Sequence, residues 1–131
     1  MATVPLIEYD QAPPEVRAVF DDIKRTRKVD DVNNFWKALA NDPVTLKRTW
    51  ESARDVMQAG ALDALTKELI YIAVSVTNGC EYCTYSHTAA AVAKGMTPAQ
   101  HGELLAVVGM ANQTNALVNG LRVPVDPQFV K

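Results

Sequence analysis

The chain has 131 residues, of which 21% are charged and 48% hydrophobic, a length and composition typical of one globular domain. Its net charge of −2 offers no basic surface, so nucleic-acid binding is not expected. No apolar run reaches the ~20 residues of a membrane span, and the first residues lack the basic and apolar regions of a signal peptide. We therefore expect a single domain over residues 1–131, cytoplasmic and without a membrane segment.

Three helices are predicted in the first half of the chain, because apolar residues recur there at helical spacing. They run from about Pro14 to Lys28, within residues 30–40, and from Pro43 to about Ala59, where Gly60 can end the last of them. Large apolar side chains of these segments are expected to lie in the core, namely Trp36, Trp50 and Met57.

Three more helices are predicted in the second half. The segment from Asp63 to Thr77 carries two apolar stripes, one through Ile72 and one through Ile70, Ala73 and Val74, which is typical of a central helix. The next segment continues to Lys94 and is ended by Gly95. Thr97-Pro98-Ala99-Gln100 is a capping box opening a helix to about Val118, and an extended apolar tail follows from Gly120. Since no strand pattern appears, the predicted fold class is all-α with about six helices.

The residues with the clearest chemistry lie between Asn78 and His87. Cys80 and Cys83 are the only cysteines, and His87 is one of two histidines. Two thiols at i and i+3 can close a disulfide within one helical turn, which suits a reversible dithiol. On a helix these three side chains lie within an arc of about 60°. Because structural disulfides are rare in the cytosol, the pair is more often redox-active or metal-binding there.

A turn at Asn78-Gly79 would bring a carboxylate to the same place. With a rise of 1.5 Å per residue, Glu68 lies roughly 15 Å before this turn and His87 roughly 12 Å after it. The turn also places Cys80 at a helix N-terminus, which favours a thiolate, and His87 one turn beyond Cys83. We therefore expect Glu68, His87 and the dithiol to share one site.

The pattern Glu68, Cys80, Cys83, His87 at these spacings resembles the alkylhydroperoxidase D-like branch of the carboxymuconolactone decarboxylase superfamily, with residues 63–95 as the motif core. The resemblance implies an all-helical protein that reduces peroxides through the dithiol without a cofactor or metal. Cys83 would attack the peroxide oxygen and become a sulfenic acid, and Cys80 would condense with it as the resolving thiol. Tyr82 stands where some members carry a second histidine, and the resemblance makes it a candidate auxiliary site residue. The implied partners are an external dithiol of lipoyl or thioredoxin type and further copies of the chain, in a trimer or hexamer.

Other interpretations stay open. Cys80, Cys83 and His87, with or without Glu68, are also a donor set for a metal ion, although structural zinc sites usually draw ligands from two separate loops. Glu68 beside Lys67 could be an ordinary surface ion pair. The chain could be an inert scaffold or oligomer module, or a muconolactone decarboxylase, although that branch does not use a Cys-x-x-Cys pair. One scaffold can carry unrelated chemistries, and only the site can decide between them.

Overall fold

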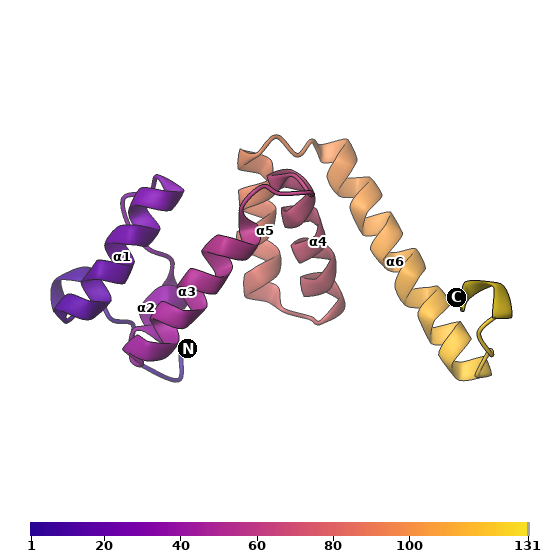
Figure 1. The fold of residues 1–131 in the computed structure, drawn as a ribbon, viewed down its shortest axis with the longest axis horizontal. Coiled ribbons are helices and arrows are strands. Elements are labelled where there is room, and N and C mark those ends of the chain that lie inside the picture. Colours follow the sequence, from indigo (N-terminus) through magenta and orange to yellow (C-terminus); the bar gives the residue numbers. More distant parts are fainter. Residues whose placement is uncertain (131) are drawn as a thin grey trace. The chain divides into compact units, whose positions relative to one another are not determined.

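The computed structural model describes residues 1–130. In this range it has six α-helices and two short 3₁₀ helices, η1 (Tyr9–Gln11) and η2 (Pro127–Phe129), and no strand (Figure 1). The predicted all-α class with about six helices is confirmed. The helices gather into two compact units, one from Met1 to Gln58 and one that begins at Ala59. That the whole chain acts as a single domain stays a prediction.

The first unit contains α1 (Pro14–Arg27), α2 (Asn34–Leu39) and α3 (Pro43–Met57). Helix α3 packs against both α1 and α2. The apolar stripe of α1 is buried as its spacing predicts, and the unit's fully buried side chains are Val16, Phe20, Ile23 and Leu46. Trp36 and Trp50 are buried beside this cluster with their rings edge to face, 5.5 Å apart between centroids. Their predicted place in the core is confirmed.

Two predictions about the end of this unit are corrected. Met57 is only partly buried and does not belong to the core cluster. Helix α3 ends at Met57, before the predicted end near Ala59, because the backbone of Gln58 is already extended with ψ 147°.

The second unit contains α4 (Ala64–Thr77), α5 (Glu81–Ala93) and α6 (Pro98–Leu121). Helix α4 packs against α5 and α6. The buried cluster between them is small, and it consists of Ile72, Ala91 and Met96 with the partly buried Leu65, Leu69, Val76 and Leu104. Ala91 has no exposed surface, and its small side chain allows the helices to approach closely.

Capping residues fix the ends of these helices. Asp63 caps α4 by accepting a hydrogen bond of 2.8 Å from the backbone N–H of Thr66. Thr97 and Gln100 form the predicted capping box at the start of α6. Gly95 follows the C-cap of α5 with φ +97°, a conformation that residues with a Cβ rarely adopt. The chain can therefore leave α5 sharply and begin α6.

The apolar surface of this unit differs from its prediction in two ways. The second stripe of α4 is not enclosed within the chain, since Ile70 is 49% and Val74 53% exposed. Helix α6 runs to Leu121, beyond the predicted end near Val118, and Val108 is its one buried residue within the range described. Sequence pattern correctly marked these faces as apolar, but it could not say whether the chain itself would cover them.

Among residues 1–130, no helix combines the length and the apolar character needed to span a membrane.

Candidate active site

The site lies on the hairpin formed by α4 and α5. Gly79 has φ +68°, a left-handed conformation that suits glycine, and it lets the chain reverse direction directly after Asn78. The turn is closed by backbone hydrogen bonds, including one of 2.9 Å from the N–H of Cys80 to the carbonyl of Ser75. The two helices then run side by side (Figure 1). Residues at equal distances before and after the turn therefore face each other.

Glu68 on α4 and His87 on α5 meet in this way. Oε2 of Glu68 lies 2.7 Å from Nδ1 of His87. Glu68 is 5% exposed, so the interpretation of this residue as a solvent-facing partner of Lys67 is wrong. With Nδ1 engaged, Nε2 is the His87 nitrogen available to a reacting group. The pair has the geometry of a carboxylate that orients an imidazole base.

Lys94, directly after α5, contacts the other oxygen of the same carboxylate. Its Nζ lies 2.9 Å from Oε1 of Glu68. Burial of Glu68 would raise the pKa of its carboxyl, but the hydrogen bonds and charges of His87 and Lys94 outweigh this effect and leave the pKa lowered. Glu68 is thus ionised at neutral pH although it is buried.

The two cysteines lie at the start of α5, the helix that also carries His87. Both are free thiols of intermediate exposure. Cys80 is the N-cap residue, and its Sγ accepts a hydrogen bond of 3.3 Å from the backbone N–H of Cys83. The hydrogen bond with the Cys80 side chain, together with burial, raises the pKa of the Cys83 thiol to about 11. At neutral pH Cys83 therefore holds its proton until a base removes it.

Hydrogen bonds thus join two pairs of predicted site residues, Glu68 with His87 and Cys80 with Cys83. The link between the pairs rests on the spacing of His87, one helical turn after Cys83 on α5.

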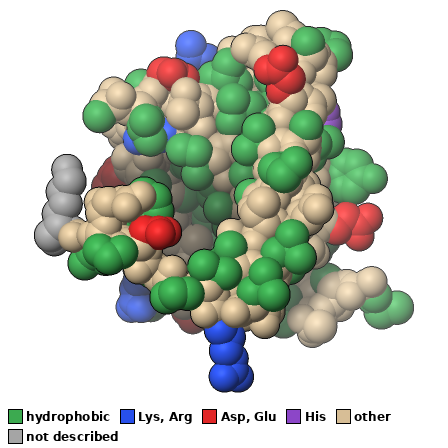
Figure 2. Space-filling model, turned by 90° about the vertical axis from the view of Figure 1, so that its right-hand side faces the viewer, with side chains coloured by type: hydrophobic (Ala, Val, Ile, Leu, Met, Phe, Trp, Pro, Cys, Tyr) green, Lys and Arg blue, Asp and Glu red, His purple; other side chains and the backbone are tan. Residues whose placement is uncertain are grey.

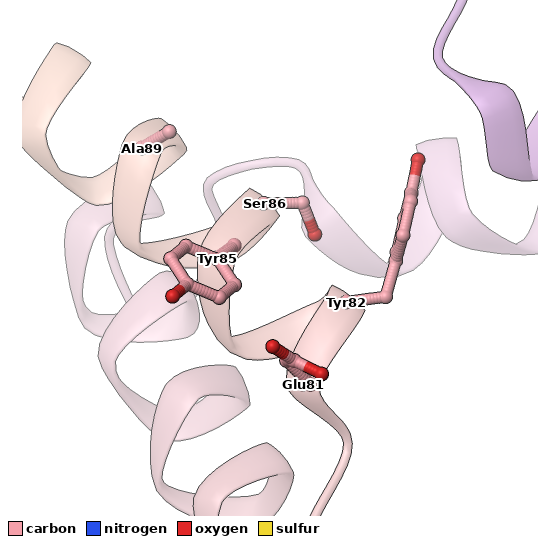
Figure 3. Close-up of a pocket in the computed structure, with 5 residues that line it drawn as sticks. All are labelled: Glu81, Tyr82, Tyr85, Ser86 and Ala89. Atoms are coloured by element: carbon pink, nitrogen blue, oxygen red, sulfur yellow. The ribbon is translucent and has the colours of Figure 1, made fainter.

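Tyr82 is the residue directly before Cys83 on α5. It is exposed and lines a shallow surface groove on α5 with Glu81, Tyr85, Ser86 and Ala89. Figure 3 shows the rings of Tyr82 and Tyr85 projecting from this helix. Tyr82 is therefore placed to contact a molecule approaching the start of α5.

Two residues that contact the pair were missed by the sequence reasoning. One is Lys94, and the other is Tyr71, whose ring stacks on that of His87 with centroids 3.5 Å apart and planes 18° apart. The helical spacing of both residues could have indicated these contacts. Lys94 follows His87 by two helical turns and Tyr71 follows Glu68 by one, so each lies on the same face as the residue it supports.

No group of three or more His, Cys, Asp or Glu side chains within residues 1–130 is arranged to hold a metal ion. The contact of Nδ1 with Glu68 leaves Nε2 of His87 free, so the metal-site alternative is decided by elemental analysis rather than by this contact.

Fold and site together define an all-α protein of the alkylhydroperoxidase D-like class. The model of the carboxymuconolactone decarboxylase family matches residues 43–126, and the chain belongs to this family. A crystal structure of an alkylhydroperoxidase AhpD core from Rhodospirillum rubrum is 60% identical in sequence, with a TM-score of 0.96, and the match covers 100% of this chain and 98% of that one. An uncharacterized protein from Cupriavidus necator is 31% identical over 81 residues, which are 61% of this chain and 72% of that protein.

Proposed function

We propose that this protein is a thiol-dependent peroxidase that reduces hydroperoxides through Cys80 and Cys83. The observation that carries the proposal is the 2.7 Å contact between Glu68 and His87, on the same helix hairpin as the dithiol. Similarity along the whole chain to an alkylhydroperoxidase AhpD core supports it.

The first step uses His87 as a general base. His87 takes the proton of the Cys83 thiol, and the sulfur attacks the terminal oxygen of the hydroperoxide ROOH. The O–O bond breaks, Cys83 becomes a sulfenic acid, and the leaving alkoxide takes the proton from His87 to form ROH. The raised pKa of Cys83 supports a requirement for a base in this step.

The second step forms the disulfide. The Cys80 sulfur attacks the sulfenic sulfur of Cys83, which releases water and forms the Cys80–Cys83 disulfide. An external dithiol of lipoyl or thioredoxin type then reduces this disulfide and is itself oxidised. The start of α5 would be the contact surface for that reductant, because Cys80 lies at the first turn of the helix.

Which cysteine attacks the peroxide, and which resolves the sulfenic acid, can be tested directly. The N-cap position favours negative charge on Cys80, whereas the spacing of His87 favours proton removal from Cys83. A dimedone-type reagent traps the sulfenic acid formed when peroxide is added to Cys80→Ser and Cys83→Ser proteins. We expect label on Cys83 in the Cys80→Ser protein and none on Cys80 in the Cys83→Ser protein. The opposite result would reverse the two roles.

The function itself is tested by a peroxidase assay. Hydrogen peroxide and several organic hydroperoxides are supplied with lipoyl and thioredoxin reducing systems, and turnover is compared between the wild type and the Cys83→Ser variant. We expect turnover that Cys83→Ser abolishes. Decarboxylation of a muconolactone in the absence of any peroxidase turnover would favour the other activity in the family's name. Elemental analysis, with thiol titration before and after reduction, tests the metal-site alternative on the same preparation.

A further inference from the structure

The carboxylate of Glu68 is shared between two cationic or potentially cationic groups of α5 and its C-cap. One oxygen lies 2.7 Å from His87 Nδ1 and the other 2.9 Å from Lys94 Nζ. The mechanism proposed above gives a role only to the contact between Glu68 and His87. Lys94 is too far along the helix to meet the cysteines, because eleven residues of helical rise, roughly 16 Å, separate it from Cys83. Its contribution must therefore pass through Glu68.

The protonation of Glu68 decides which nitrogen of His87 can act as a base. An ionised carboxylate only accepts hydrogen bonds, so the neutral imidazole beside it carries its proton on Nδ1 and leaves Nε2 free. A protonated carboxyl can donate to Nδ1 instead, and the imidazole proton then resides on Nε2. In that tautomer His87 has no nitrogen with which to take a thiol proton.

A group that stays charged throughout the cycle is needed to keep Glu68 ionised and the imidazole proton on Nδ1. His87 gains and loses a proton during the proposed cycle, so it cannot hold Glu68 ionised throughout. A carboxylate that is 5% exposed would otherwise face the cost of burying an uncompensated charge. The ammonium group of Lys94 takes no part in the proposed proton transfers, and it contacts the oxygen that His87 leaves free.

We propose that Lys94 is a positioning residue for this site: its ammonium group keeps Glu68 ionised and turned toward His87, so that the imidazole holds its proton on Nδ1 and presents Nε2 as the base. The proposal rests on the peroxidase function proposed above for its kinetic consequence, but not for its effect on the imidazole.

A purely structural role is the competing explanation. A lysine just after the last turn of a helix is favourable in any protein, because it faces the negative end of the helix dipole. The bond from Lys94 to Glu68 also ties α5 to α4. Either role would lower stability when Lys94 is replaced, so a stability measurement cannot separate them. The tautomer of His87 can separate the two roles, because only the positioning role makes it depend on Lys94.

The experiment compares Lys94→Met, which keeps most of the length of the side chain without the charge, with Lys94→Arg, which keeps the charge. Lys47→Met is the matched control, since Lys47 is exposed on α3 with only a 3.9 Å contact to Glu51. The ¹⁵N chemical shifts of the ring nitrogens distinguish N–H from unprotonated nitrogen in the reduced protein, at a pH where His87 is neutral. The chain has two histidines, so a His101→Gln variant completes the assignment.

We expect the Nδ1–H tautomer in the wild type, Lys94→Arg and Lys47→Met, and a larger share of the Nε2–H tautomer in Lys94→Met. In the peroxidase assay kcat of Lys94→Met should fall about tenfold, the loss expected for one charge-assisted hydrogen bond, with KM little changed and with activity restored in Lys94→Arg.

An unchanged tautomer and an unchanged kcat in Lys94→Met would overturn the proposal and leave Lys94 a structural residue. An Nε2–H tautomer in the wild type would also overturn it, whether or not Lys94→Met folds. The absence of peroxidase turnover in the wild type would contradict the proposed function. The ring-nitrogen shifts would still decide whether Lys94 sets the tautomer of His87.

Discussion

Glu68 combines burial with a hydrogen-bond partner on each carboxylate oxygen. Replacing it with Gln keeps the shape of the side chain but removes the charge that supports the imidazole. We expect the peroxide-dependent turnover of Glu68→Gln to fall by ~10²–10⁴-fold, the range of general acid–base contributions. The measurement is kcat/KM in the peroxidase assay, with Glu103→Gln on the exposed surface of α6 as control. A wild-type rate in Glu68→Gln would mean that the contact with His87 is only structural.

The Cys83 thiol gives a prediction about pH. Its pKa is raised to about 11, first because of the hydrogen bond with Cys80. A raised pKa favours the protonated thiol in the folded protein, so the stability that this thiol contributes is present below the usual value of 9.0 and is lost as pH rises through about 11.

Cys80→Ala removes the first cause of this shift and should lower the pKa of Cys83 from about 11 toward 9.0. The rate of alkylation of Cys83 by iodoacetamide, followed by mass spectrometry across this pH range, reports the thiolate fraction. If the alkylation curves of Cys80→Ala and the wild type have the same midpoint, the interaction between the two sulfurs is not the cause.

At the scale of the helices, the end of α5 depends on one glycine. Gly95 has φ +97°, which an L-residue adopts at a cost of about 1–2 kcal/mol. No atom lies within 4 Å of an added Cβ, so Gly95→Ala should destabilise the protein by this amount through the backbone alone. Urea unfolding provides the measurement.

Gly102→Ala is the matched control for this change. Gly102 lies inside α6 with a similarly open surrounding, and there alanine should stabilise the helix by roughly 0.5–1 kcal/mol. Equal effects of the two substitutions would contradict the role assigned to the left-handed conformation.

Local sequence signals predicted most of this hairpin. Asp63 and Gly79 mark the start of α4 and its turn into α5, and helical rise alone placed Glu68 level with His87. The parts that could not be predicted depend on side-chain direction. A lysine at a helix end looks the same in sequence whether it points to water or, as Lys94 does, to a buried carboxylate. The stacking of Tyr71 on His87 depends likewise on the rotamers of both rings.

At the scale of the whole molecule, apolar side chains remain exposed along α6 and the tail that follows it. Figure 2 faces this part of the chain, where hydrophobic groups lie at the surface. The exposed members are Leu105, Val107, Met110, Leu117, Val118, Leu121, Val123, Val125, Phe129 and Val130. Large exposed apolar surfaces usually mark an interaction site, and closed symmetric assembly is the commonest way to cover them.

We expect the protein to form a homo-oligomer, a trimer or hexamer, in which the tail packs on a neighbouring copy. Light scattering coupled to size exclusion measures the mass, and the mass of one chain at micromolar concentration would contradict this. Deleting residues 121–131 tests the tail, because an assembly of unchanged size and stability would place the interface elsewhere.

The position of Cys80 as the N-cap of α5 connects the redox state to local backbone dynamics. In the reduced protein its sulfur accepts the amide hydrogen of Cys83, whereas a disulfide sulfur is a poorer acceptor. The first turn of α5 then loses a cap when the pair is oxidised. Amide hydrogen exchange at Cys83 should accelerate on oxidation while exchange in the middle of α4 stays slow. A single backbone amide would thus report the oxidation state of the pair without any added dye or coupled enzyme.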